Sequence, residues 1–432
     1  MESVWSKTAE FPEFQPLEGD LKTGVLVIGG GITGILCAWM LRRRGVDCAL
    51  IEAGRLCGGT TGCTTAKITS QHGLIYHRLV KEFGVDAARL YWQVQEAAVG
   101  RYRELCRDVP CDFEEKDNFV YTPDHRAELE KELEALERIG APARFVREPP
   151  LPFPTLGAVC FPRQGQFHPL KFLAAIVREL PVYEHTRALE WEPGLVRTQR
   201  GTVRAERIIA ATHFPFITNH GGYFLKLYQH RSYVLALEHG PDMGGMYVDA
   251  SETGMSFRNY DGLLLLGGGG HRTGKKGGGW RELEDAARKY YPHVKIVYRW
   301  AAQDCMSLDG APYVGQYGKS TPGLYTASGF NKWGMTGAMT AAELLTDLAI
   351  GRENLYTGIF DPSRTILRPQ LAANMLESAL NLLTPTVPRC PHMGCALKYN
   401  AQEHTWDCPC HGSRFAENGK VLDGPANGDK QM

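Results

Sequence analysis

The sequence lacks the features that mark membrane, secreted and nucleic-acid-binding proteins. No apolar run comes near the roughly 20 residues that a membrane-spanning helix needs. The 48 basic residues balance 48 acidic ones, and no basic run alternates with aromatic residues. The N-terminal segment, MESVWSKTAEFPEFQPLEGDLKTG, has no basic stretch followed by an apolar one, as a secretion signal would. We therefore expect a cytoplasmic protein that acts on a small molecule, with no membrane span and no nucleic-acid partner.

Cysteine is scarce over most of the chain. Eight of the twelve cysteines are scattered over the first 305 residues, and four lie between Cys390 and Cys410. A disulfide scaffold is a short chain with disulfides along its whole length. We therefore expect the scattered eight cysteines to be core thiols, and the last four need a separate explanation. The 432 residues, 43% of them hydrophobic, are enough to bury a large core in two or three subdomains.

A glycine-rich segment near the N-terminus has the pattern of a dinucleotide-binding βαβ unit. TGVLVIGGGITGILCAWMLRRRGVDCALIEAG predicts a buried strand, a tight turn, a helix and a second strand. Gly29, Gly31 and Gly34 have the G-x-G-x-x-G spacing, and Glu52 ends the second strand, where a carboxylate accepts hydrogen bonds from a ribose diol. Glycines that serve packing alone are the alternative. A carboxylate here repels the 2'-phosphate of NADP, which favours FAD or NAD.

Three further segments resemble the glycine and D-amino-acid oxidase (DAO) superfamily of flavoproteins. They are GRLCGGTTGCTTAKITSQHG, RAERIIAATHFPFI and DGAPYVGQYGKSTPGLYTASGFNKWGMTGAMTAAELLTDLAIG. The resemblance implies FAD as cofactor, and an α/β fold with a Rossmann-like FAD-binding part of the glutathione-reductase type and a mixed β-sheet substrate subdomain. It also implies that further residues contact the FAD: Gly59, Thr60, Thr61, Thr65, Gly329, Asn331, Gly334 and Thr336. Lys332 is a candidate catalytic residue, because a cation there would support negative charge on a reduced flavin.

Two positions depart from the resembling family. His213 stands where many relatives have glycine, and Cys63 stands where some relatives carry a histidine that is covalently attached to the flavin. A cysteinyl flavin and a plain thiol are both open at Cys63. In the middle of the chain, residues 72–108 and 125–140 have helical periodicity, and 217–299 is typical of strands. By resemblance such a sheet lines the substrate pocket, with Tyr233, Arg258, His271 and Arg272 as candidates.

The crowded cysteines belong to the segment CPHMGCALKYNAQEHTWDCPCHGS. Each of two short loops supplies one cysteine and one histidine, whereas a Cys2His2 zinc finger places both cysteines first. The boxes CPHMGC and CPCHGS resemble the Rieske [2Fe-2S] family, and a zinc site is the alternative. The resemblance implies that Cys390 and Cys408 bind one iron, that His392 and His411 bind the other, and that Cys395 and Cys410 form a disulfide.

These segments predict two domains. A DAO-like domain would span 20–383, with FAD-binding parts at about 20–80, 155–215 and 300–360 and a substrate subdomain at about 217–299. A minimal Rieske domain would span 384–432 as a small all-β lobe. Because about forty residues bury little surface of their own, we expect this lobe to lean on the flavin domain.

The joint prediction is an FAD-dependent oxidoreductase that oxidises a carbon–nitrogen bond of an amine or amino acid. The resulting electrons would pass singly through the cluster to an external one-electron acceptor protein. Two alternatives are open. The first is a reductase in which electrons flow from the cluster to the flavin, so that the protein partner is a donor. The second is an electron-transfer or redox-sensing protein with no substrate.

Overall fold

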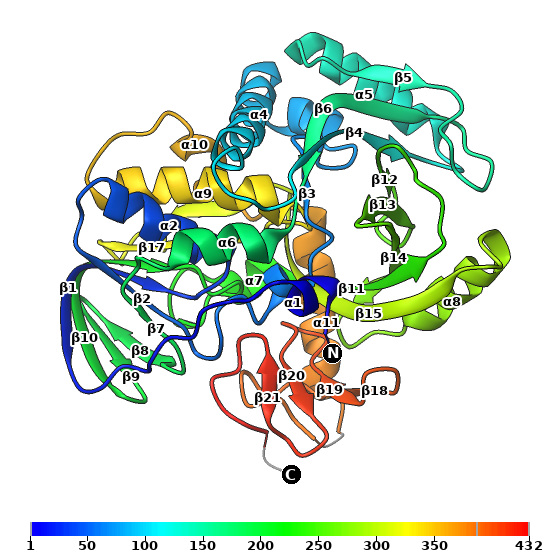
Figure 1. Ribbon diagram of the computed structural model, residues 1–432. Coiled ribbons are helices and arrows are strands. Elements are labelled where there is room, and N and C mark those ends of the chain that lie inside the picture. The colour runs from blue at the N-terminus through cyan, green and yellow to red at the C-terminus, as the bar shows by residue number, and fades with distance from the viewer. Residues whose placement is uncertain (1, 386–387, 431–432) are drawn as a thin grey trace.

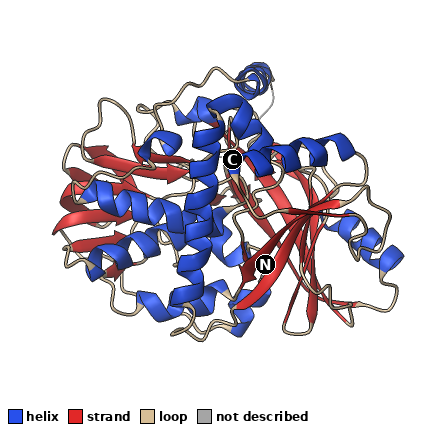
Figure 2. Ribbon diagram, turned by 90° about the horizontal axis from the view of Figure 1, so that it is seen from above, coloured by secondary structure: helices blue, strands red, loops and turns tan. Residues whose placement is uncertain are grey.

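The computed structural model describes residues 2–385 and 388–430, which form three sheets and the helices between them (Figure 1). Seen from above, helices run between two large groups of strands (Figure 2). No helix in the described residues is long and apolar enough to cross a bilayer.

The first sheet is built around the glycine-rich segment. Strand β1 (Leu21–Ile28) leads through the turn into α2 (Ile32–Arg43) and β2 (Cys48–Ile51), as the sequence predicts. β1 pairs in parallel with β2 and with β10 (Gly201–Ala210), and β10 pairs in parallel with β17 (Leu324–Ser328). Four further strands complete the sheet: β7 (Val182–Tyr183), β8 (Ala188–Glu192), β9 (Leu195–Thr198) and β16 (Tyr313–Gln316).

A layer of helices separates the two large sheets. Helix α2 packs against α9 (Gly334–Ala349) and α6 (Pro169–Val177), and α9 also packs against α4 (Val85–Leu105). Helices α3 (Tyr76–Phe83) and α4 occupy the predicted helical stretch, and α5 (Arg126–Ile139) is the predicted charged helix. The short helical segments are α1 (Val4–Thr8), η1 (Thr60–Cys63), α7 (Tyr223–Lys226) and α10 (Thr357–Phe360).

The second sheet has nine strands drawn from distant parts of the chain. Its order is β15-β11-β14-β13-β12-β4-β6-β3, with β5 paired to β6. The strands within or next to the predicted range are β11 (Leu227–Glu238), β12 (Met246–Asp249), β13 (Ser256–Tyr260), β14 (Leu263–Arg272) and β15 (Lys295–Ser307). Those from earlier residues are β3 (Lys67–Ile68), β4 (Glu114–Tyr121), β5 (Arg144–Val146) and β6 (Ala158–Gln166). Helix α8 (Gly279–Tyr290) interrupts the range for which strands are predicted.

The C-terminal lobe is a four-stranded antiparallel sheet below the rest of the molecule in Figure 1. Its strands are β18 (Lys398–Asn400), β19 (Thr405–Asp407), β20 (Arg414–Ala416) and β21 (Val421–Asp423). Its small core consists of the four cysteines with Leu397, Phe415 and Ala426.

Helix α11 (Pro369–Leu383) joins this lobe to the larger domain and has an unusual orientation. It buries Asn374 and Asn381, whereas Leu376 and Leu383 are 62% and 82% exposed. The Asn374 carboxamide oxygen accepts a hydrogen bond from Arg272 Nη1 at 2.9 Å, and the Asn381 carbonyl accepts one from Ala396 N at 3.0 Å. The polar side of the helix therefore faces the protein.

Candidate cofactor and substrate sites

The glycine turn has the local geometry that close approach of a phosphate group requires. Gly29 has a φ of +108°, and a side chain at Gly34 would place its Cβ 1.9 Å from the Gly29 carbonyl oxygen. A Cβ at Gly31 would meet only Thr61 Oγ1, at 3.3 Å. The N-cap residue of α2, Gly31, has no side chain to cap the helix, so the first-turn amides other than that of Ile32, which donates to Thr61, are available to an anion. The turn thus fits the pyrophosphate of a dinucleotide.

Glu52 closes the turn from the end of β2. Its carboxylate accepts hydrogen bonds from the backbone amides of Gly30, at 2.7 Å, and Gly54, at 2.8 Å. The predicted second loop contacts the same region, because Thr61 Oγ1 accepts a bond from the amide of Ile32 at 3.1 Å. Thr60 and Thr65 line the main cavity, while Gly59 directly precedes η1.

The late residues predicted to contact FAD fall into two groups. Asn331 and Lys332 line the main cavity, and both have left-handed backbone conformations, with φ of +52° and +72°. Gly329 and Gly334 flank them in the turn that leads into α9. Thr336, by contrast, is buried inside the protein, where its hydroxyl lies 2.9 Å from both the Thr69 carbonyl and His72 Nε2. His213 keeps a glycine-like conformation, with a φ of +64°.

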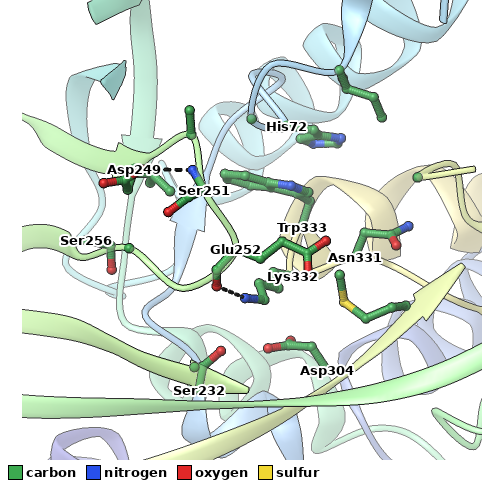
Figure 3. A pocket seen from close by; sticks show the side chains of 18 of the residues that line it. His72, Ser232, Asp249, Ser251, Glu252, Ser256, Asp304, Asn331, Lys332 and Trp333 are labelled. Carbon is green, nitrogen blue, oxygen red and sulfur yellow. Dashed lines mark hydrogen bonds between the residues drawn. The ribbon is translucent and has the colours of Figure 1, made fainter. Parts of the chain in front are cut away.

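The main cavity has a volume of about 740 Å³ and lies between the second loop, the nine-stranded sheet and the turn before α9. Figure 3 shows Asp304 and Ser232 on one side, and Lys332 beneath the loop that contains Glu252. Lys332 Nζ donates a hydrogen bond to the Glu252 carbonyl at 3.0 Å, and burial lowers the pKa of Lys332. His72 stacks on Trp333, with ring centroids 5.3 Å apart, and burial lowers the pKa of His72 to about 3. That imidazole is therefore neutral at physiological pH.

Some of the residues predicted to line the substrate pocket line the main cavity, and others lie elsewhere. Tyr233 lines the cavity, and so does Cys63, whose thiol has a pKa raised by burial. Arg258 was expected to line the pocket, but its buried guanidinium instead donates to the carbonyls of Thr65 and Ala66, at 2.7 and 2.9 Å. The expectations for His271 and Arg272 were also wrong: neither belongs to the cavity lining, and Arg272 Nε donates to the Pro409 carbonyl at 3.0 Å.

The two cysteine–histidine boxes form paired turns in the C-terminal lobe. The amide of Gly394 donates to the Cys390 carbonyl at 2.9 Å, and the amide of Gly412 donates to the Cys408 carbonyl at the same distance. Both glycines have left-handed φ values, +76° and +82°. These turns bring Cys390, His392, Cys408 and His411 together at one end of the lobe, where the two imidazole rings have centroids 5.0 Å apart.

The donor atoms at this end fit a metal cluster with mixed thiolate and imidazole ligands. Both ring nitrogens of His392 and Nδ1 of His411 are buried without a hydrogen-bond partner. His411 Nε2 lies 3.1 Å from the Phe224 carbonyl oxygen, the backbone contact that typically orients a ligating histidine. Burial lowers the pKa of both imidazoles to about 4, so both are neutral and able to coordinate a metal.

Cys395 and Cys410 are both free cysteines in this structure. Their sulfur atoms and that of Cys408 all lie within 4.8 Å of one another. The pairing of the four sulfurs stays a prediction.

The lobe is fixed to the flavin domain by a buried ion-pair network. The Glu403 carboxylate accepts hydrogen bonds from Arg231 Nε and the Tyr233 hydroxyl, both at 3.0 Å, and from Arg414 Nη2 at 2.7 Å. Arg414 also pairs with Asp407 at 3.2 Å. The Glu403 and Arg231 side chains are only 1% and 4% exposed. Sequence reasoning missed this network because charged residues so far apart in the chain give no signal of contact.

Strand β15 lies between the cavity and the cluster end of the lobe. Ala302, Asp304 and Met306 line the cavity, as expected for alternate residues of a strand. Gln303 points the other way, and its Nε2 donates to the Gly412 carbonyl at 2.9 Å. The main cavity and the cluster loop thus contact opposite faces of β15.

Comparison with known proteins agrees with this two-part arrangement. The FAD-dependent oxidoreductase (DAO) family model matches residues 24–348, and the Rieske [2Fe-2S] domain model matches residues 383–431. The chain is 32% identical to YhfW of Bacillus subtilis (strain 168), named as a Rieske 2Fe-2S iron-sulfur protein, over 98% of this chain and 96% of that protein. It is 25% identical to gamma-glutamylputrescine oxidoreductase of Escherichia coli (strain K12), over 79% of this chain and 86% of that enzyme.

Among solved structures, glycine oxidase from Geobacillus kaustophilus has the same fold, with a TM-score of 0.68 and 20% identity. The match covers 80% of this chain and 100% of that one. The chain belongs to the DAO family of FAD-dependent oxidoreductases and has a C-terminal Rieske domain, so that its cofactors are FAD and a [2Fe-2S] cluster.

Proposed function

We propose that this enzyme oxidises a carbon–nitrogen single bond of an amine or amino acid and delivers the electrons one at a time to an external acceptor protein. The product would be an imine, which water then hydrolyses to a carbonyl compound and an amine or ammonia. Bound FAD supplies two-electron chemistry, and a bound [2Fe-2S] cluster supplies one-electron chemistry.

The observation that supports this proposal is the position of β15. The cavity that would hold the substrate and the loop of Cys408 and His411 are on opposite sides of this strand, and Gln303 is hydrogen-bonded to that loop. A short separation favours direct electron transfer between the two sites. The names of the glycine oxidase and the gamma-glutamylputrescine oxidoreductase support a carbon–nitrogen bond as the reacting group.

The chain's own residues have defined tasks in this proposal. Lys332 would lie close to the bound flavin and favour its reduced, anionic form. His72, which is neutral and stacked on Trp333, would shape the cavity without adding charge. Gln303 and the Glu403 network would hold the cluster loop against the sheet.

An anaerobic titration of the holoenzyme with a panel of amines and amino acids tests the proposal. We expect the flavin absorbance to bleach first and the EPR signal of a reduced Rieske cluster to follow. Bleaching by a reduced ferredoxin but by no amine would support the opposite flow of electrons, and a cluster that responds to dithionite alone would support a redox-sensing protein.

We also propose that Cys395 and Cys410 form a disulfide beside the cluster, leaving Cys390 and Cys408 as its thiolate ligands. The closeness of the buried sulfurs supports the bridge. Mass spectrometry after alkylation without reduction would detect it. Replacing Cys395 by serine should then leave iron content unchanged, whereas loss of iron would assign Cys395 to the cluster.

A further inference from the structure

The Asp304 carboxylate is the one charged group on the cavity side of β15. Its neighbours on that side, Ala302 and Met306, are apolar, and Figure 3 shows the carboxylate facing the open space near Lys332. Among the described residues, no hydrogen bond or ion pair to this carboxylate is found within the usual distances. Lys332 directs its ammonium group to the Glu252 carbonyl instead.

A half-buried carboxylate on a cavity wall that accepts no hydrogen bond from the protein is destabilised, because part of its hydration is lost and not replaced. Burial raises the pKa of Asp304, and the positive charge of Lys332 offsets this effect only in part. A ligand that brings a positive charge into the cavity would supply the missing partner, whereas a ligand carboxylate would be repelled.

The arginines of the cavity lining point to the same conclusion. Recognition of an α-carboxylate favours a guanidinium, whose two parallel N–H groups match the carboxylate geometry. The described lining contains two arginines. Arg78 is exposed to solvent, and Arg368 pairs with Glu82 at 3.0 Å. Neither arginine belongs to β15, and the Lys332 ammonium near Asp304 is hydrogen-bonded to the Glu252 carbonyl, so β15 presents a carboxylate and no guanidinium to the cavity.

We propose that Asp304 binds the ammonium group of the substrate, and that the substrate is an amine without an α-carboxylate. This inference rests on the proposed oxidation of a carbon–nitrogen bond and names its substrate class. The step is binding alone, in which no bond forms or breaks.

A pair of probe molecules with the same shape and different charge tests the inference without turnover. Choline and its uncharged carbon analogue 3,3-dimethylbutanol would each be titrated into the oxidised holoenzyme, with the flavin absorbance and isothermal calorimetry as readouts. We expect choline to bind at least about 10-fold more tightly, because only its quaternary ammonium brings a positive charge close to the Asp304 carboxylate. Equal affinities would overturn the inference.

Two variants assign the effect to one residue. Asp304→Asn keeps the side-chain size and should abolish the preference for choline, while retained binding of dimethylbutanol shows that the site is intact. Asp249→Asn removes another carboxylate of the same cavity lining and should leave the preference unchanged. A preference that survives Asp304→Asn, or that disappears in Asp249→Asn, would contradict the assignment.

The substrate class is tested with matched pairs such as ethylamine and alanine. The amine should bind more tightly than the amino acid in the wild type, and tighter binding of the amino acid would overturn the inference. Failure of the proposed function gives a different result: the binding preference persists, but no amine bleaches the flavin.

Discussion

Replacing Glu403 by glutamine tests whether the buried ion pairs fix the C-terminal lobe to the flavin domain. The substitution preserves the size of a side chain that is 1% exposed. It leaves Arg231, which is 4% exposed and forms no other ion pair among the described residues, without a negative partner. Removing one member of a buried pair costs about 3–5 kcal/mol, because the remaining charge stays desolvated. Arg414 keeps its contact with Asp407, so it adds little to this cost.

That energy corresponds to an increase of about a hundred-fold to several thousand-fold in the fraction of undocked lobes. Hydrogen exchange of the amides in β19 and β20, followed by mass spectrometry of the holoenzyme, would measure it as an equivalent loss of protection. Glu417→Gln is the matched control, because Glu417 belongs to the same lobe but is exposed, and its carboxylate is paired with Tyr399 and His404 within the lobe. Equal protection in the two variants would refute the structural role of Glu403.

Three further predictions concern other parts of the molecule. Gly34→Ala should lower the unfolding temperature of the apoprotein and Gly31→Ala should not, because only the first Cβ meets a backbone atom, at 1.9 Å; equal shifts in calorimetry would contradict this. Burial, with a contribution from Arg364, lowers the pKa of Lys226 to about 8. Between pH 8 and 10.5 the unfolded chain keeps a proton that the folded chain has released, so the free energy of unfolding should rise by up to about 1.4 kcal/mol per pH unit. Lys226→Met should remove that rise, as measured by urea unfolding at pH 8 and 10, and an unchanged slope would assign it to another group. Cys408→Ser should abolish the cluster absorbance while flavin content is retained, with Cys160→Ser as the control in which both cofactors are kept.

Local patterns predicted the parts of the fold that consist of consecutive residues. The turn at Gly29, its flanking strands and the helix α2 follow directly from glycine spacing and hydrophobic periodicity. The small all-β lobe could be predicted because its two boxes each contain a complete turn. In both segments the backbone conformation is determined by residues that are close together in the sequence.

The pairing of strands and the contacts between distant parts of the chain could not be predicted from the sequence. Strands β4 and β6 join the same sheet as β11 although they precede it by many residues, and no local pattern indicates which strands pair. Helix α11 shows a second limit, because leucines are normally the buried residues of a helix, whereas here Asn374 and Asn381 are buried, with Asn374 bonded to Arg272 and the Asn381 backbone carbonyl bonded to Ala396. Arg272 has a similar explanation: it was expected at the substrate pocket, yet its donors match carbonyls of the cluster loop.

The docking of the lobe has a consequence for the order of biosynthesis. Because Arg231 is encoded well before Glu403, the flavin domain leaves the ribosome with its docking surface complete and one guanidinium still without its acid. At about 5–20 residues per second, the lobe follows as the last few seconds of translation. A chain that stops before the lobe would therefore expose a cationic, partly aromatic surface that contains Arg231 and Tyr233. This exposed surface alone would distinguish the incomplete chain from the complete one.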